Sequence, residues 1–182
     1  IVVDSPCPGP MCQAELRDPF DPTARGKRTV FLNFGGVTLE ATPYDDDARY
    51  NRSAIAQYDM SIPAFDVDDL SDDGGLTRGQ IIERAVEDMY RIYAPYDVEF
   101  VTTRPSSGSY QMVVFGSDCE TVAGDNDCVG IGLRDCDDVM PNNIVFAFPL
   151  GQRVEDLGST GAHENGHALG LEAGDPERHR HH

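Results

Sequence analysis

Short apolar runs along the chain predict a set of β-strands. Apolar runs bounded by glycine or proline are typical of strands, and a continuous run indicates burial on both faces. The run at 143–148, which Pro149 ends, is the clearest of them. The predicted strands are residues 29–34, 97–102, 111–115, 129–133 and 143–148, of which 129–133 is expected to be a short edge strand.

The segment 77–93 has the spacing of an amphipathic helix. Thr77 and Gln80 form the pattern of a capping box, in which each side chain bonds to the backbone N–H of the other residue. Apolar residues then recur at helical intervals. Because this helix follows strand 29–34 and precedes strand 97–102, the three elements predict a parallel crossover unit.

A second helix is predicted near the end of the chain. It is expected to begin between Asp156 and Ser159 and to end near Gly170. Gly161 and Gly166 would each cost roughly 1 kcal/mol in a helix interior relative to alanine. We therefore expect close packing against the helix at both glycines.

These elements predict one α/β domain. The chain has 182 residues, of which 40% are apolar, and this is sufficient for a single core. We expect a mixed, mostly parallel twisted sheet of about five strands, with a crossover helix and the second helix near the C-terminus. Residues 1–28 are expected to be an irregular N-terminal segment, and residues 29–182 the domain.

The net charge of −18 limits the partners of the protein. Such a field repels nucleic acid and acidic membrane surfaces, so we expect neither as a partner, and we expect a monomer. No apolar run reaches the roughly 20 residues that cross a bilayer. The acidic run 66–75 resembles a calcium loop in composition but lacks the spacing of an EF-hand. A solvated loop is the favoured interpretation, and a structural Ca²⁺ site is the alternative.

The five cysteines indicate an oxidising compartment. Cys7 and Cys12 enclose a short ring that favours a local disulfide. Cys119, Cys128 and Cys136 lie in a segment without histidine, so a second disulfide is favoured there over a zinc ribbon. The remaining cysteine is then free or pairs outside this chain. We therefore expect a secreted protein.

The segment His163-Glu164-Asn165-Gly166-His167 on the second helix predicts a zinc site. Residues four apart lie on the same helix face, so the two histidines can offer ring nitrogens to one ion. Glu164 is placed to reach a zinc-bound water and to take its proton during peptide hydrolysis. The predicted roles are zinc ligand for His163 and His167 and general base for Glu164.

Residues 163–171, His-Glu-x-x-His-x-x-Gly-Leu, resemble the metzincin clan of zinc endopeptidases. The order of elements over residues 29–172 is similar to the upper subdomain of secreted bacterial reprolysin-like and matrixin-like members. The resemblance implies a zinc-dependent endopeptidase that acts on peptides or proteins. It also implies a third histidine ligand three residues after Gly170, where this chain has Ala173. The methionine turn and most of the lower subdomain of the clan have no counterpart in the sequence.

The substitution at Ala173 leaves three explanations open. The third ligand comes from a later residue, lies beyond His182, or has been lost. The later residues with metal-binding side chains are Glu172, Asp175, His179, His181 and His182.

Three functions are consistent with the sequence. The leading hypothesis is a secreted zinc endopeptidase whose substrate adds as a strand along 129–133. The alternative is a catalytically inert extracellular binding domain on the same fold, which Ala173 supports. The third is a calcium-binding module with a chance histidine pair, which only residues 66–75 support.

Overall fold

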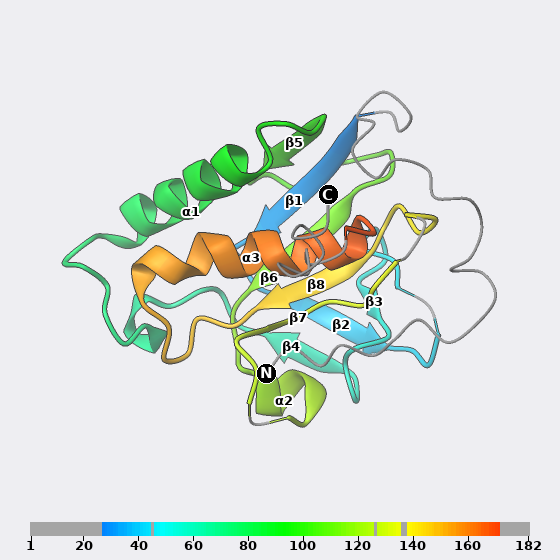
Figure 1. Ribbon diagram of the computed structural model, residues 1–182. Coiled ribbons are helices and arrows are strands. Elements are labelled where there is room, and N and C mark those ends of the chain that lie inside the picture. The colour runs from blue at the N-terminus through cyan, green and yellow to red at the C-terminus, as the bar shows by residue number, and fades with distance from the viewer. Residues whose placement is uncertain (1–26, 45, 126, 136–137, 172–182) are drawn as a thin grey trace, which may run out of the picture.

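The central sheet is mixed and mostly parallel. The computed structural model describes residues 27–44, 46–125, 127–135 and 138–171 (Figure 1). The strands of the sheet are β1 (Arg28–Asn33), β5 (Val98–Val101), β6 (Gln111–Phe115), β7 (Gly130–Ile131) and β8 (Ile144–Ala147). Their order is β5-β1-β6-β8-β7, in which only β7 runs antiparallel to its neighbour. The predicted mostly parallel sheet of about five strands is confirmed.

The predicted strands agree with the structure within two residues at each end. The strands β6 and β8 are buried along their whole length. Their continuous apolar runs therefore reflect cover on both faces, as in other parallel sheets. The predicted irregular segment 1–28 lies outside the described residues, apart from Lys27 and Arg28, and Arg28 is the first residue of β1.

The first long helix, α1 (Arg78–Ile92), begins at the predicted cap. The side chain of Thr77 accepts from the backbone N–H of Gln80, and Gln80 Oε1 accepts from the N–H of Thr77 at 2.9 Å. The capping box is therefore confirmed. This helix connects β1 to β5, which lie side by side and parallel, so the predicted crossover unit is also confirmed.

The second long helix, α3 (Val154–Ala168), begins two residues before the predicted range. Its N-cap residue is Arg153, whose side chain makes no capping hydrogen bond, so the start has no cap signal and is marked only by Glu155 and Asp156 in the first turn. The helix ends as predicted. Leu169 is the C-cap, and Gly170 has a φ of 71°, a left-handed conformation that favours glycine.

A second layer of short elements was not predicted. It contains the three-stranded sheet β3-β2-β4 and the helix α2. Its strands lie in a polar, turn-rich part of the chain and contain no continuous apolar run, although β2 alternates apolar and polar residues. The elements of this layer are β2 (Val37–Ala41), β3 (Arg52–Ser53), β4 (Met60–Ile62) and α2 (Cys119–Ala123). The 3₁₀ helix Val67–Asp69 was also not predicted and lies outside this layer, because Val67 packs against the core that contains residues of α1 and α3.

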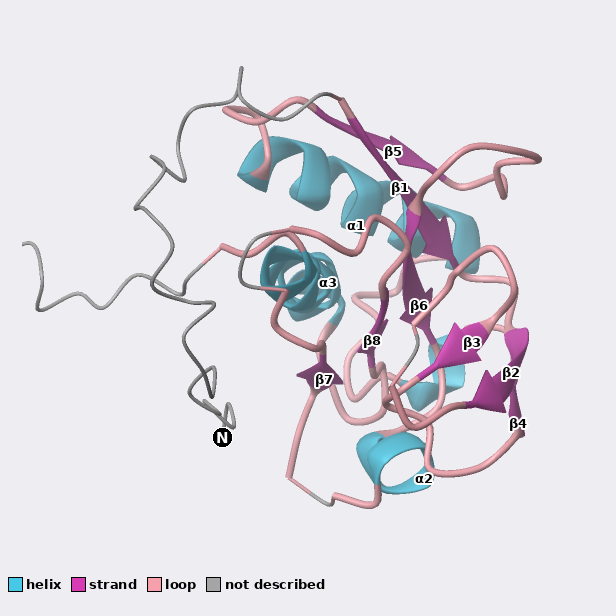
Figure 2. Ribbon diagram, turned by 90° about the vertical axis from the view of Figure 1, so that its right-hand side faces the viewer, coloured by secondary structure: helices cyan, strands magenta, loops and turns pink. Residues whose placement is uncertain are grey.

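The central sheet lies between α1 and α3 on one face and the smaller sheet on the other, as Figure 2 shows, and an apolar core fills each of the two interfaces. On β6, Val113 and Phe115 face the core beneath α1 and α3, whereas Met112 and Val114 face the core beneath the smaller sheet. Successive residues of a strand point to opposite faces, which explains this division. Within the described residues, no helix is long and apolar enough to cross a membrane.

One disulfide joins the start of α2 to the residue before Val129. It links Cys119 to Cys128, which confirms a bond within the predicted group of three cysteines. Cys7, Cys12 and Cys136 lie outside the described residues. The bond fixes the approach of the chain to β7, which begins two residues later.

Two glycines bring α3 close to its neighbours. A Cβ atom on Gly161 would lie 2.7 Å from Cζ of Phe115, and one on Gly158 would lie 2.7 Å from Cβ of Asp88 in α1. The predicted close packing is therefore confirmed at Gly161. At Gly166 that prediction is wrong, because its nearest neighbour, the Tyr93 hydroxyl oxygen, would be at an ordinary 3.5 Å.

Alanine substitutions at Gly161 and at Gly166 should have different effects on the stability of the protein. We expect Gly161→Ala to lower the free energy of unfolding by about 1–3 kcal/mol, because the methyl group overpacks against Phe115. We expect Gly166→Ala to leave it unchanged or to raise it by up to about 1 kcal/mol through helix propensity. Urea unfolding of both variants measures the difference, and equal changes would contradict this packing.

Candidate active site

The two histidines of the predicted zinc motif lie on one face of α3 with their ring nitrogens together. The Nε2 atoms of His163 and His167 are 3.2 Å apart, and the ring planes are nearly perpendicular at 87°. His163 is exposed, whereas His167 is buried. The four-residue spacing on the helix therefore directs both imidazoles to one position.

The spacing of the two nitrogens fits a shared metal ion. Two nitrogen ligands at about 2.0–2.1 Å from a tetrahedral zinc ion lie about 3.3–3.4 Å apart. The observed separation of 3.2 Å is close to this value. His163 and His167 are therefore the residues that would hold zinc in this part of the chain.

The third ligand is not found among the described residues. Within them, no group of three or more histidine, cysteine or acidic side chains is arranged to hold a metal. The later residues with metal-binding side chains, Glu172, Asp175, His179, His181 and His182, lie outside the described residues, as does Ala173.

The side chain of Glu164 is enclosed between α3 and β7. It is 7% exposed, and an ideal Cβ on Gly130 would lie 2.7 Å from its Cγ and 2.8 Å from its Oε1. Burial disfavours the ionised carboxylate and raises the pKa of Glu164 to about 7. A carboxyl with a pKa near neutrality can both accept and return a proton, as a general base must.

Tyr93 fixes α3 directly before the histidine motif. This residue is the C-cap of α1, and its hydroxyl donates to the carbonyl of Ala162 at 2.8 Å. The phenol is buried, and burial raises the pKa of Tyr93 above its usual range. The hydroxyl therefore remains a proton donor, and it holds the turn that carries His163 against α1.

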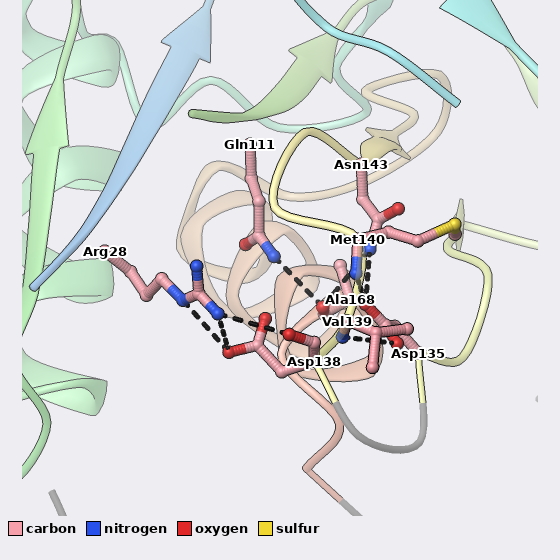
Figure 3. Close-up of polar contacts among 8 residues, drawn as sticks. All are labelled: Arg28, Gln111, Asp135, Asp138, Val139, Met140, Asn143 and Ala168. Carbon is pink, nitrogen blue, oxygen red and sulfur yellow. Dashed lines mark hydrogen bonds and ion pairs between the residues drawn. The ribbon is translucent and has the colours of Figure 1, made fainter. Parts of the chain in front are cut away.

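The other end of the motif is fixed by two buried amide side chains (Figure 3). Gln111 Nε2 and Asn143 Nδ2 donate to the carbonyl of Ala168 at 3.0 and 3.3 Å. The last carbonyls of a helix have no partner within the helix, so these bonds replace water at a buried helix end. Because Gln111 begins β6 and Asn143 directly precedes β8, the sheet positions the turn that carries His167.

A loop anchored by Asp135 closes around the same helix end. The backbone N–H of Asp135 donates to the carbonyl of His167 at 3.0 Å. Its carboxylate accepts from the backbone N–H groups of Val139 at 3.0 Å and Met140 at 2.7 Å (Figure 3). An ion pair between Arg28 and Asp138 joins this loop to the start of β1.

The anchoring residues were not predicted from the sequence. Gln111 and Asn143 were assigned only as strand positions, and Asp135 was not singled out. A polar residue at the beginning of an otherwise apolar strand is the signal that would have marked Gln111 and Asn143. For Asp135 the sequence holds no such signal, because its partners belong to the loop that follows it and to the end of α3.

The strand β7 is the outermost strand next to α3, and no described strand pairs with its other side. The backbone N–H of Phe148 donates to the carbonyl of Val129, and Gly130 is opposite Ala147. Hydrogen-bonded positions alternate in an antiparallel pair, so the backbone groups of Gly130 point away from β8. Within the described residues, the backbone N–H and carbonyl of Gly130 at this edge have no hydrogen-bond partner, and they lie beside the helix that carries Glu164.

The carboxylates of the acidic run 66–75 organise its own turns. Asp66, Asp72 and Asp73 accept backbone N–H groups two residues later, at 3.1, 2.9 and 2.8 Å. These are local turn contacts of a kind that aspartate commonly makes. Burial, followed by the nearby charges of Asp66 and Asp68, raises the pKa of Asp69. The structural Ca²⁺ site stays an untested prediction.

Comparison with known proteins gives no relative. No protein-family model matches the chain, and neither a curated protein nor a solved structure is significantly similar to it.

The pKa of Glu164 predicts a pH dependence of stability in the metal-free protein. The folded pKa is about 7, whereas an exposed carboxyl has a pKa of 4.5. The protonated form is thus favoured by folding, and this contribution is fully present below pH 4.5 and is lost as the pH rises through about 7. The loss is about 3 kcal/mol.

Urea unfolding of chelator-treated protein across this pH range measures the effect. The matched control is Glu164→Gln, which keeps the shape of the side chain but does not ionise. We expect the control to lose markedly less stability over the range. An identical pH profile for the two proteins would contradict the buried carboxyl.

Proposed function

We propose that the protein is a secreted zinc-dependent endopeptidase of the metzincin type. His163 and His167 bind the zinc ion, and Glu164 is the general base. The observation that carries this proposal is the 3.2 Å separation of the two Nε2 atoms beside a buried carboxyl on the same helix. The histidine motif is followed by Gly170 and Leu171, and this sequence context supports the metzincin assignment.

The residues around the helix have distinct roles in this proposal. Bound zinc would supply a water molecule of lowered pKa and a positive charge for the scissile carbonyl. Glu164 takes a proton from the attacking water and returns it to the leaving amine, for which its pKa of about 7 is suitable. Tyr93, Gln111 and Asn143 hold the helix at both ends of the motif.

An extended peptide is the proposed substrate, and the free edge of β7 is its proposed docking surface. The backbone N–H and carbonyl of Gly130 face this edge. The neighbouring side chains of Val129 and Leu133 are 57% and 38% exposed, which provides apolar contact area on each side. Strand addition of this kind gives affinity through main-chain hydrogen bonds.

The disulfide supports the proposed secretion, and the net charge limits the proposed partners. The bond between Cys119 and Cys128 is of a kind that persists in oxidising compartments, as expected for a secreted protein. The net charge of −18 supports a protein that does not bind nucleic acid or acidic membranes.

An inert binding domain on the same fold is the second candidate. Two observations favour it: Ala173 stands where the resemblance implies a histidine, and the described residues provide only two ligands. This candidate differs from the endopeptidase in a measurable way. It binds zinc weakly or not at all and does not hydrolyse casein.

Substitution of Glu164 tests the proposed chemistry. We expect Glu164→Ala to lower kcat for casein or a peptide substrate at least about 100-fold, because the general base is lost. The zinc content after dialysis should stay near that of the native protein, since Glu164 is not a ligand. The matched variant His167→Ala should lose both zinc and activity. A Glu164→Ala protein that cleaves at the native rate would refute the assignment.

Backbone-modified peptides test the docking at β7. Only alternate residues of an added strand bond to the edge, so N-methylation at every second position should weaken binding at least about tenfold. N-methylation at the positions between them should have little effect. Fluorescence anisotropy with the Glu164→Ala protein measures binding without cleavage, and equal losses for both peptide series would exclude strand addition.

A further inference from the structure

The segment 129–132, which contains β7, approaches α3 so closely that neither Gly130 nor Gly132 could carry a side chain without a shift of its neighbours. Figure 2 shows the strand next to the helix. Ideal Cβ atoms on Gly130 and Gly132 would both come within 3.0 Å of atoms of α3. The sequence Val129-Gly130-Ile131-Gly132 therefore places its two glycines on the side that faces the helix, and Ile131 on the other.

The two glycines face different atoms of the same residue. A Cβ on Gly130 would meet the side chain of Glu164, at 2.7 Å from Cγ and 2.8 Å from Oε1, and Cγ2 of Thr160 at 2.9 Å. A Cβ on Gly132 would instead meet the backbone carbonyl oxygen of Glu164 at 2.8 Å and Cγ1 of Val145 at 3.0 Å. Only Gly130 lies directly against the carboxyl group.

The strand is held next to α3 by hydrogen bonds at its start and along β8. Gln152 is buried, its Nε2 donates to the carbonyl of Val129 at 3.1 Å, and its Oε1 accepts from Oγ1 of Thr160 at 2.8 Å. In the pairing with β8, Gly130 lies opposite Ala147 and Ile131 lies opposite Phe146. Because these bonds resist a retreat of β7, a side chain at position 130 would displace the Glu164 carboxyl before it displaced the strand.

We infer that Gly130 is a positioning residue for Glu164. Because glycine has no side chain, the Glu164 carboxyl group occupies the space in which a Cβ atom of residue 130 would lie, and β7 holds it there against α3. This inference rests on the proposed function for its catalytic consequence, but its packing is independent of that function. Gly132 has a purely structural role, since it accommodates the backbone of the helix.

A double-mutant cycle on thermal stability tests the packing. We expect Gly130→Ala to lower the melting temperature by about 3–10 °C in the native protein. In a Glu164→Ala background part of this loss should disappear, because two of the three atoms within 3.0 Å are gone and only Cγ2 of Thr160 remains. Gly132→Ala is the matched control, and its loss should be the same in both backgrounds, because the backbone oxygen that it meets is unchanged.

Steady-state kinetics tests the positioning. We expect Gly130→Ala to lower kcat at least tenfold, with KM within about twofold of the native value and an unchanged zinc content. A purely structural defect would instead lower the amount of folded, zinc-loaded protein and leave kcat per bound zinc unchanged. The kinetic comparison is therefore made per equivalent of zinc.

The outcomes separate this inference from the proposed function. Equal losses of melting temperature for Gly130→Ala in both backgrounds would overturn the inference, as would native kcat in a folded, zinc-loaded Gly130→Ala protein. A native protein without zinc and without proteolysis would refute the proposed function. In that case the stability cycle alone still decides whether Gly130 holds Glu164 in place.

Discussion

The close contact between α3 and the central sheet determines where every candidate functional group lies. Gly161 rests on the ring of Phe115, and Gly158 rests on α1, at distances that exclude even a methyl group. The helix therefore sits deep enough for Glu164 and His167 to be buried while His163 reaches the surface. Glycines that reduce helix propensity are retained here because the packing distance requires them.

Burial of Glu164 has opposite consequences for stability and for chemistry. Enclosure by β7 and α3 disfavours the ionised form of the Glu164 carboxyl, and this lowers the free energy of unfolding at neutral pH. The same enclosure gives the carboxyl a proton affinity near the value that proton transfer at neutral pH requires. Perturbed groups of this kind concentrate at functional sites, although structural networks also produce them. Here the adjacent histidine pair supports the functional interpretation.

The sequence predicts those parts of the structure that depend on neighbouring residues. The strands of the central sheet, the capping box at Thr77 and the histidine pair each follow from a local pattern. The elements β2 to β4 were not predicted because they lie in a polar, turn-rich part of the chain and contain no continuous apolar run. The anchors Gln111 and Asn143, and the contact of Gly130 with Glu164, join segments far apart in the chain. A polar residue before an apolar run marks the two anchors as unusual, but no local pattern names their partner.

The helical turns that carry the histidine pair are held by the fold on both sides of the motif. Tyr93 bonds to Ala162 before the motif, and Gln111 and Asn143 bond to Ala168 after it, so the helical turns between these points are fixed to α1 and to the sheet. Many small metal sites gather their ligands only when the ion binds, and ion binding then contributes to folding. A prearranged pair needs no such ordering, so loss of a third ligand would reduce affinity for zinc without dispersing the two nitrogens.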